Sequence, residues 1–404
     1  MAVRGTPSWL GDENAASALE LLLQHGPQSR NGLSGLSGLS KQTAAQIVSR
    51  LVDRDLIEPV GEESPTRGPS AIVYGVRSTL SYAVAINIDQ QGVQSQVVDV
   101  LGAAHPIVRQ DTAALDRERS AARDVATAVL RACEAAEVDL AAVDQVCIGV
   151  PSSVDPRSDE LSSVEALPGW SRTSVRQQLE TALGCSVRVD NDANLAVVAE
   201  RRAGHFDPAA TLALIWVGYG IGLALDIGGT ILRGAAGGAG EIGHLPISYG
   251  RPGVDGGQTD LEDLVGATGL ERLAREIAEP DFSFDAILAD QALSTRMIEH
   301  LAPRLALGIT PVLGVVDPEL IIIGGPVGQA GGVRLTEAIR EAIRNHTRWD
   351  PSILLSRVTA DPVLTGAANL LLTDLRRTLV ERARTAEHED NRSRAIESRL
   401  RKIH

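Results

Sequence analysis

The stretch that decides the fold is TLALIWVGYGIGLALDIGGTIL, residues 211–232. Two apolar runs flank the glycine-rich turn GYG, a pattern that predicts two buried strands joined by a tight turn. YAVAINIDQQGVQSQVVDVLG, residues 82–102, follows the same plan of strand, glycine turn and strand. One such unit at the start of each half predicts a duplicated α/β fold with a cleft between two lobes.

The composition places the chain among soluble globular proteins. Hydrophobic residues make up 44% of the 404 residues and charged residues 22%. No apolar run approaches the roughly 18 residues of a membrane-spanning helix, and the N-terminus lacks a signal-peptide pattern. We therefore expect a cytoplasmic protein without a membrane partner. Three scattered cysteines, at 133, 147 and 185, are too few for a disulfide framework or a zinc cluster.

The net charge of −14 is unevenly distributed. Residues 1–80 contain seven Lys and Arg against eight Asp and Glu, so nearly all of the negative charge lies in the remainder of the chain. An acidic body repels the phosphates of nucleic acid. If DNA is a partner, the nearly neutral N-terminal segment must bind it.

That N-terminal segment, residues 1–79, has the pattern of a winged helix-turn-helix. AASALELLLQH, residues 15–25, has helical spacing, and residues 29–61 continue as two short amphipathic helices that turn at Gly38. Ser40 is placed to cap the second of these helices by accepting from the amide of Thr43. Two strands joined by SPTRGPS follow. A small helical dimerisation module is the alternative interpretation.

The second helix of such a motif lies in the major groove and presents its N-terminal residues to base edges. Gln pairs with adenine, and Lys reaches guanine or a phosphate. Arg50 and Arg54 lie further along, where phosphate contact is expected, and Arg67 at the wing tip could enter the minor groove. The predicted DNA-binding residues are Ser40, Lys41, Gln42, Thr43, Gln46, Arg50 and Arg67.

Two polar motifs in the body indicate a polyol site. Asn191 and Asp192 follow a predicted strand, at the edge where α/β sheets bind ligands, and an adjacent amide and carboxylate suit neighbouring hydroxyls. Glu241 and His244 lie in the glycine-rich loop GGAGEIGH, where the backbone can approach a ligand closely. Each has a structural alternative: Asn-Asp is a common helix cap, and a loop histidine can fix a turn.

Together these motifs resemble the ROK family of repressors, open reading frames and sugar kinases, and above all its repressor branch. The resemblance extends to about residue 373 and rests on the helix-turn-helix together with IGVPSSVD (148–155), LPGW (167–170), VDNDAN (189–194), GYGIGLALDIGGTILRGAAGGAGEIGHLPI (218–247) and DPELIIIGG (317–325). It implies a two-lobed actin-like ATPase fold, of the ribonuclease H-like type, over residues 80–373. Residues 374–404 are interpreted as a polar helical tail, solvated or contacting another subunit.

The resemblance also implies roles for particular residues. In the family, the Glu and His of the glycine-rich loop contact the sugar, and the His joins three cysteines around a zinc ion. Here the cysteine positions are Gly253, Asp255 and Asp260, a poor ligand set for zinc, so we expect no metal and no other cofactor. The expected sugar-binding residues are Asn191, Asp192, Glu241, His244 and Glu262.

The two segments of this chain that correspond to the phosphate loops of the family kinases depart from the kinase pattern. Gln90 and Gln91 replace small residues in the first loop, and Tyr219 replaces a small hydroxyl residue in the second. Phosphoryl transfer depends on positioned phosphates, so we expect no kinase activity, although Asp192 matches the catalytic-base position. LDIGGT, residues 225–230, resembles a phosphate loop but falls where the family has a strand and a hairpin turn.

The sequence therefore favours a sugar-responsive repressor that binds operator DNA, as a homodimer or a dimer of dimers, and responds to a sugar or sugar phosphate. The alternative is a ROK-type sugar kinase with an added DNA-binding domain. A third reading, a repressor whose effector site has decayed, is opposed by the retention of all five expected sugar-binding residues.

Overall fold

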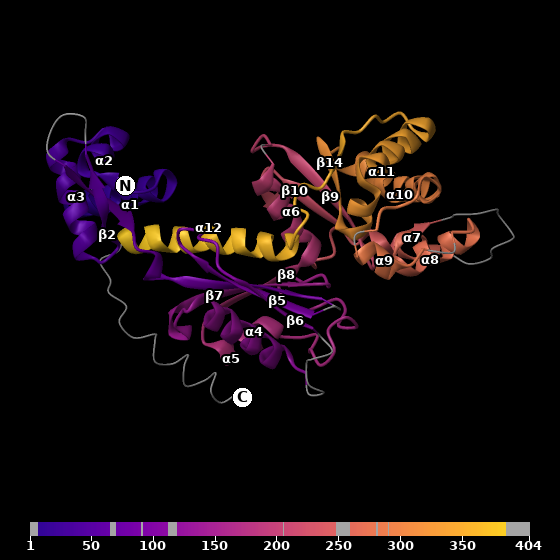
Figure 1. The fold of residues 1–404 in the computed structure, drawn as a ribbon, viewed down its shortest axis with the longest axis horizontal. Coiled ribbons are helices and arrows are strands. Elements are labelled where there is room, and N and C mark those ends of the chain that lie inside the picture. The colour runs from indigo at the N-terminus through magenta and orange to yellow at the C-terminus, as the bar shows by residue number, and fades with distance from the viewer. Residues whose placement is uncertain are drawn as a thin grey trace.

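The computed structural model describes residues 7–64, 70–89, 92–111, 119–204, 206–247, 259–279, 282–289 and 291–384. Three parts are visible in it (Figure 1): a small N-terminal domain, a first lobe below the long helix α12, and a second lobe at the far end of that helix. Among the described residues, none of the helices combines the length and apolar surface that crossing a bilayer requires.

The N-terminal domain is the expected winged helix-turn-helix. Its elements are α1 (Pro7–His25), β1 (Gln28–Ser29), α2 (Arg30–Ser37), α3 (Lys41–Asp53), β2 (Ile57–Glu63) and β3 (Ala71–Val76). The strands form a sheet in the order β1-β3-β2. Gly38 ends α2 with a φ of 71°, and the side chain of Ser40 accepts from the amide of Thr43 at 3.1 Å, as predicted. Leu19, Leu33, Val48 and Leu51 form the centre of the domain's core.

Lobe 1 is a five-stranded sheet in the order β6-β5-β4-β7-β8. Its strands are β4 (Tyr82–Ile88), β5 (Gly92–Asp99), β6 (Ile107–Asp111), β7 (Val143–Val150) and β8 (Ser186–Asn191), and its own helices are α4 (Ala121–Ala136) and α5 (Val175–Leu183). The first three strands are antiparallel, whereas β4, β7 and β8 are parallel. Two short 3-10 helices, η1 (Ser78–Leu80) and η3 (Leu140–Ala142), precede β4 and β7.

Lobe 2 repeats this plan in the order β11-β10-β9-β14-β15. Its strands are β9 (Thr211–Val217), β10 (Ile221–Ile227), β11 (Thr230–Ile231), β14 (Leu320–Gly324) and β15 (Ile353–Leu355). Counting strands along each lobe, both sheets have the order 3-2-1-4-5, so the predicted duplication is confirmed. The segment LDIGGT forms the end of β10 and the hairpin turn to β11, with positive φ at Gly228 and Gly229.

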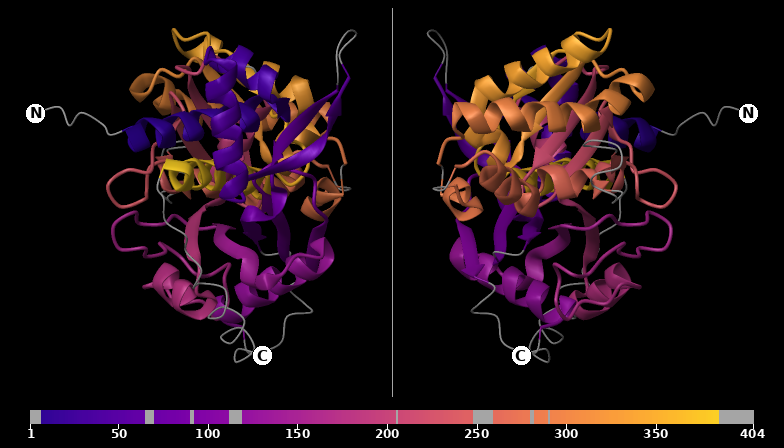
Figure 2. Two further views of the ribbon diagram at one scale, coloured as in Figure 1. Left: turned by 90° about the vertical axis from the view of Figure 1, so that its left-hand side faces the viewer. Right: turned by 90° about the vertical axis from the view of Figure 1, so that its right-hand side faces the viewer.

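Further helices and short strands complete the body. They are α6 (Asp192–Ala203), η4 (Ile242–His244), β12 (Pro246–Ile247), β13 (Thr259–Asp260), α7 (Leu261–Val265), α8 (Ala267–Glu276), α9 (Phe284–Leu288), α10 (Thr295–Val315), α11 (Gly325–His346) and α12 (Pro362–Arg384). Figure 2 shows, from both ends, that the N-terminal domain and lobe 2 lie on the same side of lobe 1. Helix α12 runs between them (Figure 1).

The domain boundary expected at residue 373 is wrong, because it falls inside α12. Residues 374–384 are not a solvated tail but the last turns of this helix, and they pack against α1. The polar residues of the segment interrupt an apolar stripe at helical spacing, which the composition alone concealed. The buried members of that stripe are Leu371, Leu375, Leu379 and Ala383. Residues 385–404 lie outside the described ranges.

Arg54 fastens the N-terminal domain to the end of this helix. Its Nη1 donates to the carbonyl oxygen of Ala383 at 2.7 Å, and its Nη2 lies 2.7 Å from Asp12 Oδ1. Both charged side chains are mostly buried, at 20% and 14% exposure. A guanidinium at a helix C-terminus also interacts favourably with the helix dipole. Arg54 therefore links α1, α3 and α12.

Replacing Arg54 by Ala should lower the free energy of unfolding by about 1–3 kcal/mol, because Asp12 and the carbonyl of Ala383 lose a charged partner. The matched control is Arg384→Ala, which removes pairs to Glu13 and Glu20 at the same interface. Those side chains are more than 40% exposed, so that loss should be below about 1 kcal/mol. Urea denaturation measures both, and an Arg54 effect no larger than the control would contradict this role.

Candidate functional site

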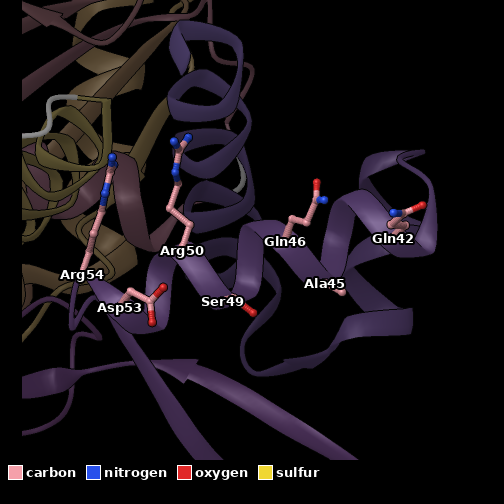
Figure 3. A pocket seen from close by; sticks show the side chains of 7 residues that line it. All are labelled: Gln42, Ala45, Gln46, Ser49, Arg50, Asp53 and Arg54. Carbon is pink, nitrogen blue, oxygen red and sulfur yellow. The ribbon is translucent and has the colours of Figure 1, made fainter. Parts of the chain in front are cut away.

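The exposed face of α3 carries short and amide-bearing side chains. Ala44, Ile47, Val48 and Leu51 bury the opposite face, which leaves Lys41, Gln42 and Gln46 in solvent. A groove of about 480 Å³ follows the helix, lined by Gln42, Ala45, Gln46, Ser49, Arg50, Asp53 and Arg54 (Figure 3). Ser40 and Thr43 hold the start of the helix, since their hydroxyl oxygens lie 2.9 Å apart in a hydrogen bond.

Arg50 and Arg54 also make contacts within the protein that the sequence did not indicate. Both extend from the same side of α3, and each guanidinium contacts Asp12 of α1, at 3.3 Å and 2.7 Å. A Cβ at Gly11 would lie only 2.3 Å from Arg50 Nη1, so the arginine lies directly against α1. These two arginines therefore connect helices within the protein. Arg67 lies outside the described residues, and its minor-groove role stays a prediction.

Ala45 and Ser49 line the groove but were missed by sequence reasoning. They lie on the same helical face as Gln42 and Gln46, and the spacing of residues 42, 45, 46 and 49 could have indicated them. Asp53 closes the far end of the groove with a carboxylate. The N-terminal half of the groove therefore carries no charged side chain, whereas Arg50, Asp53 and Arg54 line its C-terminal half.

In the body, Asn191 and Asp192 lie where β8 of lobe 1 passes into α6. Asn191 caps the helix by accepting from the amide of Asn194 at 3.2 Å, and its Nδ2 donates to the carbonyl of Ser152 at 3.4 Å. Asp192 accepts from the amide of Ala193 at 2.7 Å. Burial, together with the carboxylates of Glu241 and Asp89, raises the pKa of Asp192 to about 6.

The glycine-rich loop brings Glu241 and His244 towards these residues from lobe 2. At Gly237, with a φ of 79°, a Cβ would lie 2.2 Å from the carbonyl oxygen of Val154 in lobe 1. At Gly240, with a φ of 96°, a Cβ would lie 1.9 Å from the carbonyl oxygen of Leu223 in β10. Only glycine allows both the backbone conformation and the close approach. The loop therefore fits between lobe 1 and β10.

An ion pair that sequence reasoning missed also holds this loop. Arg233, just before the glycines, pairs with the buried carboxylate of Asp190, which immediately precedes Asn191. The same carboxylate accepts from the backbone amide of Asn191 at 3.0 Å. A basic residue next to the loop and an acidic one next to the Asn-Asp pair were the available signals. The pair joins the two sequence motifs of the site directly.

Glu262, the second residue of α7, completes the cluster. A Cβ at Gly243 would lie 2.9 Å from its Oε2, and one at Gly220 would lie 3.0 Å from the same atom. Burial and the carboxylates of Asp260 and Glu241 raise the pKa of Glu262, and His244 opposes them. The His244 side chain is 76% exposed. All five predicted residues thus lie at the facing edges of the two lobes, while their role in sugar binding stays a prediction.

The described residues do not fit the family's zinc site. His244 Nδ1 lies 4.0 Å from Asp260 Oδ2, and positions 253 and 255 lie outside the described ranges. Within those ranges, no cluster of three or more His, Cys, Asp or Glu side chains is placed to hold a metal ion. Two donors, one of them a carboxylate, fall short of the four ligands of a tetrahedral structural zinc site.

The two turns that correspond to phosphate loops are occupied by the protein's own groups. Asp89 Oδ1 accepts from the amide of Gly92 at 3.0 Å, which uses a donor that could face a phosphate. Gln90 and Gln91 lie outside the described residues. Tyr219, in the second turn, packs against Phe284 of α9 with the rings tilted by 52° and their centroids 4.8 Å apart.

A second cavity, of about 370 Å³, lies in lobe 2 where α11 begins. No motif pointed to it, because its walls come from four separate segments. Its lining, which includes no charged side chain, is Trp216, Ile287, Leu288, Ala292, Gly325, Pro326, Gln329, Ala330, Val358, Thr359 and Pro362.

Comparison with known proteins identifies the family to which the chain belongs. Residues 98–374 match the sequence model of the ROK family. The chain belongs to the ROK family. It is 21% identical over 399 residues to a xylose repressor of Caldicellulosiruptor bescii, covering 92% of this chain and 98% of that protein. It is 34% identical over 187 residues to a glucokinase of Halalkalibacterium halodurans, covering 41% of this chain and 57% of the kinase.

Solved ROK structures show the same fold. A ROK family transcriptional regulator, a homologue of the E. coli MLC protein, superposes with a TM-score of 0.66 at 22% identity, covering 93% of this chain and 99% of that one. A ROK family glucokinase from Streptomyces griseus superposes with a TM-score of 0.56 at 23% identity, covering 72% and 99%. The regulator thus matches nearly the whole chain, whereas the kinase matches less of it.

The raised pKa of Asp192 determines whether the free energy of unfolding rises or falls with pH. Between about pH 4 and pH 6 the folded chain holds more protons at this carboxyl than the unfolded chain, so the free energy of unfolding should fall as the pH rises through that window. Asp192→Asn should remove this contribution to the slope and increase stability above about pH 6. Urea denaturation at a series of pH values measures it.

Asp155→Asn serves as the control for this experiment. Backbone amides of Arg157 and Ser158 lower the pKa of that exposed carboxyl, so its removal should leave the window above about pH 4 unchanged. Equal slopes in the parent and Asp192→Asn proteins would show that the carboxyl is not perturbed.

Proposed function

We propose that this ROK protein is a sugar-responsive transcription repressor, which binds operator DNA through α3 and a small sugar between its two lobes. The observation that carries the proposal is the union of two surfaces in one fold: an exposed face of Lys, Gln and Ser on α3, and a polyol-type cluster of carboxylates and an amide in the cleft. The likeness to a xylose repressor over 92% of the chain supports it.

Contact with DNA is assigned to the N-terminal half of α3. The exposed side chains there are those of Lys41, Gln42 and Gln46 (Figure 3 shows the two glutamines). Gln recognises adenine through its amide, and Lys adds a phosphate or guanine contact. One such helix makes few contacts, so we propose that two copies of the chain bind two half-sites as a homodimer or a dimer of dimers.

Changing Lys41 and Gln42 together to Ala should weaken operator binding at least about 10-fold, since a base contact of this kind contributes about 1–3 kcal/mol. Sugar binding should be unchanged, because the cleft lies at the other end of the body. Gln24→Ala, an exposed glutamine on α1, is the control. Fluorescence anisotropy with a labelled operator measures the affinity, and full binding by the double variant would exclude this surface.

Communication between the surfaces is assigned to α6 and α12. Asp192 lies at the start of α6, and further along this helix the buried Glu200 accepts from the amides of Arg357 and Val358 at 3.2 Å and 3.0 Å. Those residues lie in the short segment that leads into α12, whose other end contacts Arg54. This route is more direct than the linker near VRSTLSYA, residues 76–83. A sugar that shifts α6 would shift the helix that carries the DNA-binding domain.

A sugar changes operator affinity only by its differential affinity for two states of the protein. A coupling of about 1–3 kcal/mol, roughly 5–150-fold in affinity, is typical. Asp192→Ala and Glu241→Ala should therefore bind operator like the parent and fail to respond to sugar. Titrating a labelled operator complex with a panel of monosaccharides and disaccharides measures the response. A normal response from Asp192→Ala would refute the proposed switch.

The second candidate function is a sugar kinase with an added DNA-binding domain, since Asp192 occupies the position of the kinases' catalytic base. Two observations favour the repressor. At the first turn, the side chain of Asp89 accepts a hydrogen bond from the backbone amide of Gly92. At the second turn, the ring of Tyr219 lies against Phe284. We infer that these contacts suit the two turns poorly to phosphates, on whose positioning phosphoryl transfer depends. A coupled ATPase assay with a panel of sugars distinguishes the two functions.

A further inference from the structure

The charges around the cleft bear on which kind of sugar it accepts. The charged groups that act most strongly on Asp192 are both carboxylates, Glu241 and Asp89. Glu241 also acts on Glu262, as does Asp260. Negative groups from both lobes thus converge on the place where hydroxyls would bind. Carboxylates accept hydrogen bonds from hydroxyls but repel another anion.

Two arginines of the described residues near this cluster are paired with carboxylates. Arg233 binds the buried Asp190, and Arg109 binds Asp361, the residue before α12. Asp361 also accepts from the side-chain Nε2 of Gln94 at 3.0 Å. His244 faces Asp260 and is largely exposed. A guanidinium that is neutralised by its own carboxylate has little charge left for a phosphate.

Backbone donors at the start of α6 and in the turn between β4 and β5 are used as well. A helix N-terminus is an anion site because its first amides lack partners. At α6 the side chain of Asp192 accepts from the amide of Ala193, and that of Asn191 accepts from the amide of Asn194. At the turn between β4 and β5, Asp89 accepts from the amide of Gly92. Both candidate anion sites therefore already hold an acceptor from the protein itself.

We propose that the effector of this protein is an uncharged sugar, and that Asp89, Asp192 and Glu241 reject the same sugar when it carries a phosphate. The inference rests on the proposed function and narrows its ligand class. A phosphate ester at any hydroxyl bound by Asp192 would lie beside two further carboxylates. Selection acts by repulsion rather than by a better contact with the neutral sugar.

The test compares matched pairs on the full-length protein: glucose with glucose 6-phosphate, and N-acetylglucosamine with its 6-phosphate. Isothermal titration calorimetry gives the affinities, and a labelled operator reports the response. For the pair whose neutral member binds, the phosphorylated member should bind at least about 10-fold more weakly. That ratio should shrink as salt is raised from about 50 to 500 mM, because salt screens the repulsion.

Asp89→Asn isolates the electrostatic cause. The amide oxygen can still accept from Gly92, while the negative charge is lost, so the ratio between neutral and phosphorylated sugar should fall at least about threefold. Asp139→Asn is the matched control: this aspartate also accepts a backbone amide, from Ala141 at 2.9 Å, but at the opposite end of β7 from the cleft. It should leave the ratio unchanged.

Three outcomes overturn the inference, and they differ in what else they reject. A phosphorylated sugar that binds as tightly as its parent, or more tightly, rejects the uncharged effector while leaving the repressor intact. An unchanged ratio in Asp89→Asn rejects the carboxylate mechanism. Failure of every sugar, neutral or phosphorylated, to bind or to change operator affinity rejects the proposed function together with the inference.

Discussion

The packing of α12 is the constraint on which the rest of this structure depends. One apolar core runs from α1 through α12 to lobe 1 and α6, and it includes Leu19, Leu379, Ala83 and Leu195. The N-terminal domain is therefore packed against the body, because its own core residues belong to this cluster. At Gly366 of α12 a Cβ would lie 1.8 Å from the carbonyl oxygen of Leu195, so the two helices touch backbone to backbone. A contact this close leaves little freedom for one helix to move without the other.

This contact connects the candidate sugar site to α12. Helix α6 begins at Asp192, so the carboxylate that lies in the cleft is carried by a helix locked to α12. Glu200 adds polar bonds from the same helix to the segment before α12, and Arg54 holds the far end. A rigid connection between two distant surfaces is the physical requirement for coupling, since it lets a local rearrangement be transmitted rather than absorbed.

The cleft itself is built by close backbone approach. Gly237 and Gly240 allow their loop to meet lobe 1 and β10 at distances that any side chain would prevent, and the pair of Arg233 with Asp190 fixes the loop to β8. The same pair neutralises a cation that would otherwise attract phosphate. One ion pair thus both shapes the site and leaves no free positive charge on Arg233.

The sequence by itself determined the parts of this protein that are encoded locally. The helical periods, the Ser40 cap and the Gly38 turn specify the winged helix-turn-helix, and the repeated strand, turn and strand plan specifies two lobes. The polar motifs indicated one polyol site for Asn191, Asp192, Glu241 and His244, whereas Glu262 was assigned to it only through the resemblance to the ROK family.

Only the tertiary structure decided the features that depend on distant pairings. Arg50 and Arg54 look like phosphate ligands on an isolated helix, but α1 supplies Asp12 and turns both inward. Residues 374–384 look like a polar tail, but α1 covers the stripe of Leu375, Leu379 and Ala383. Likewise, Arg233 pairs with Asp190, which lies 43 residues earlier in the sequence. Partner and burial come from chain segments far apart in sequence, so no local pattern carries them.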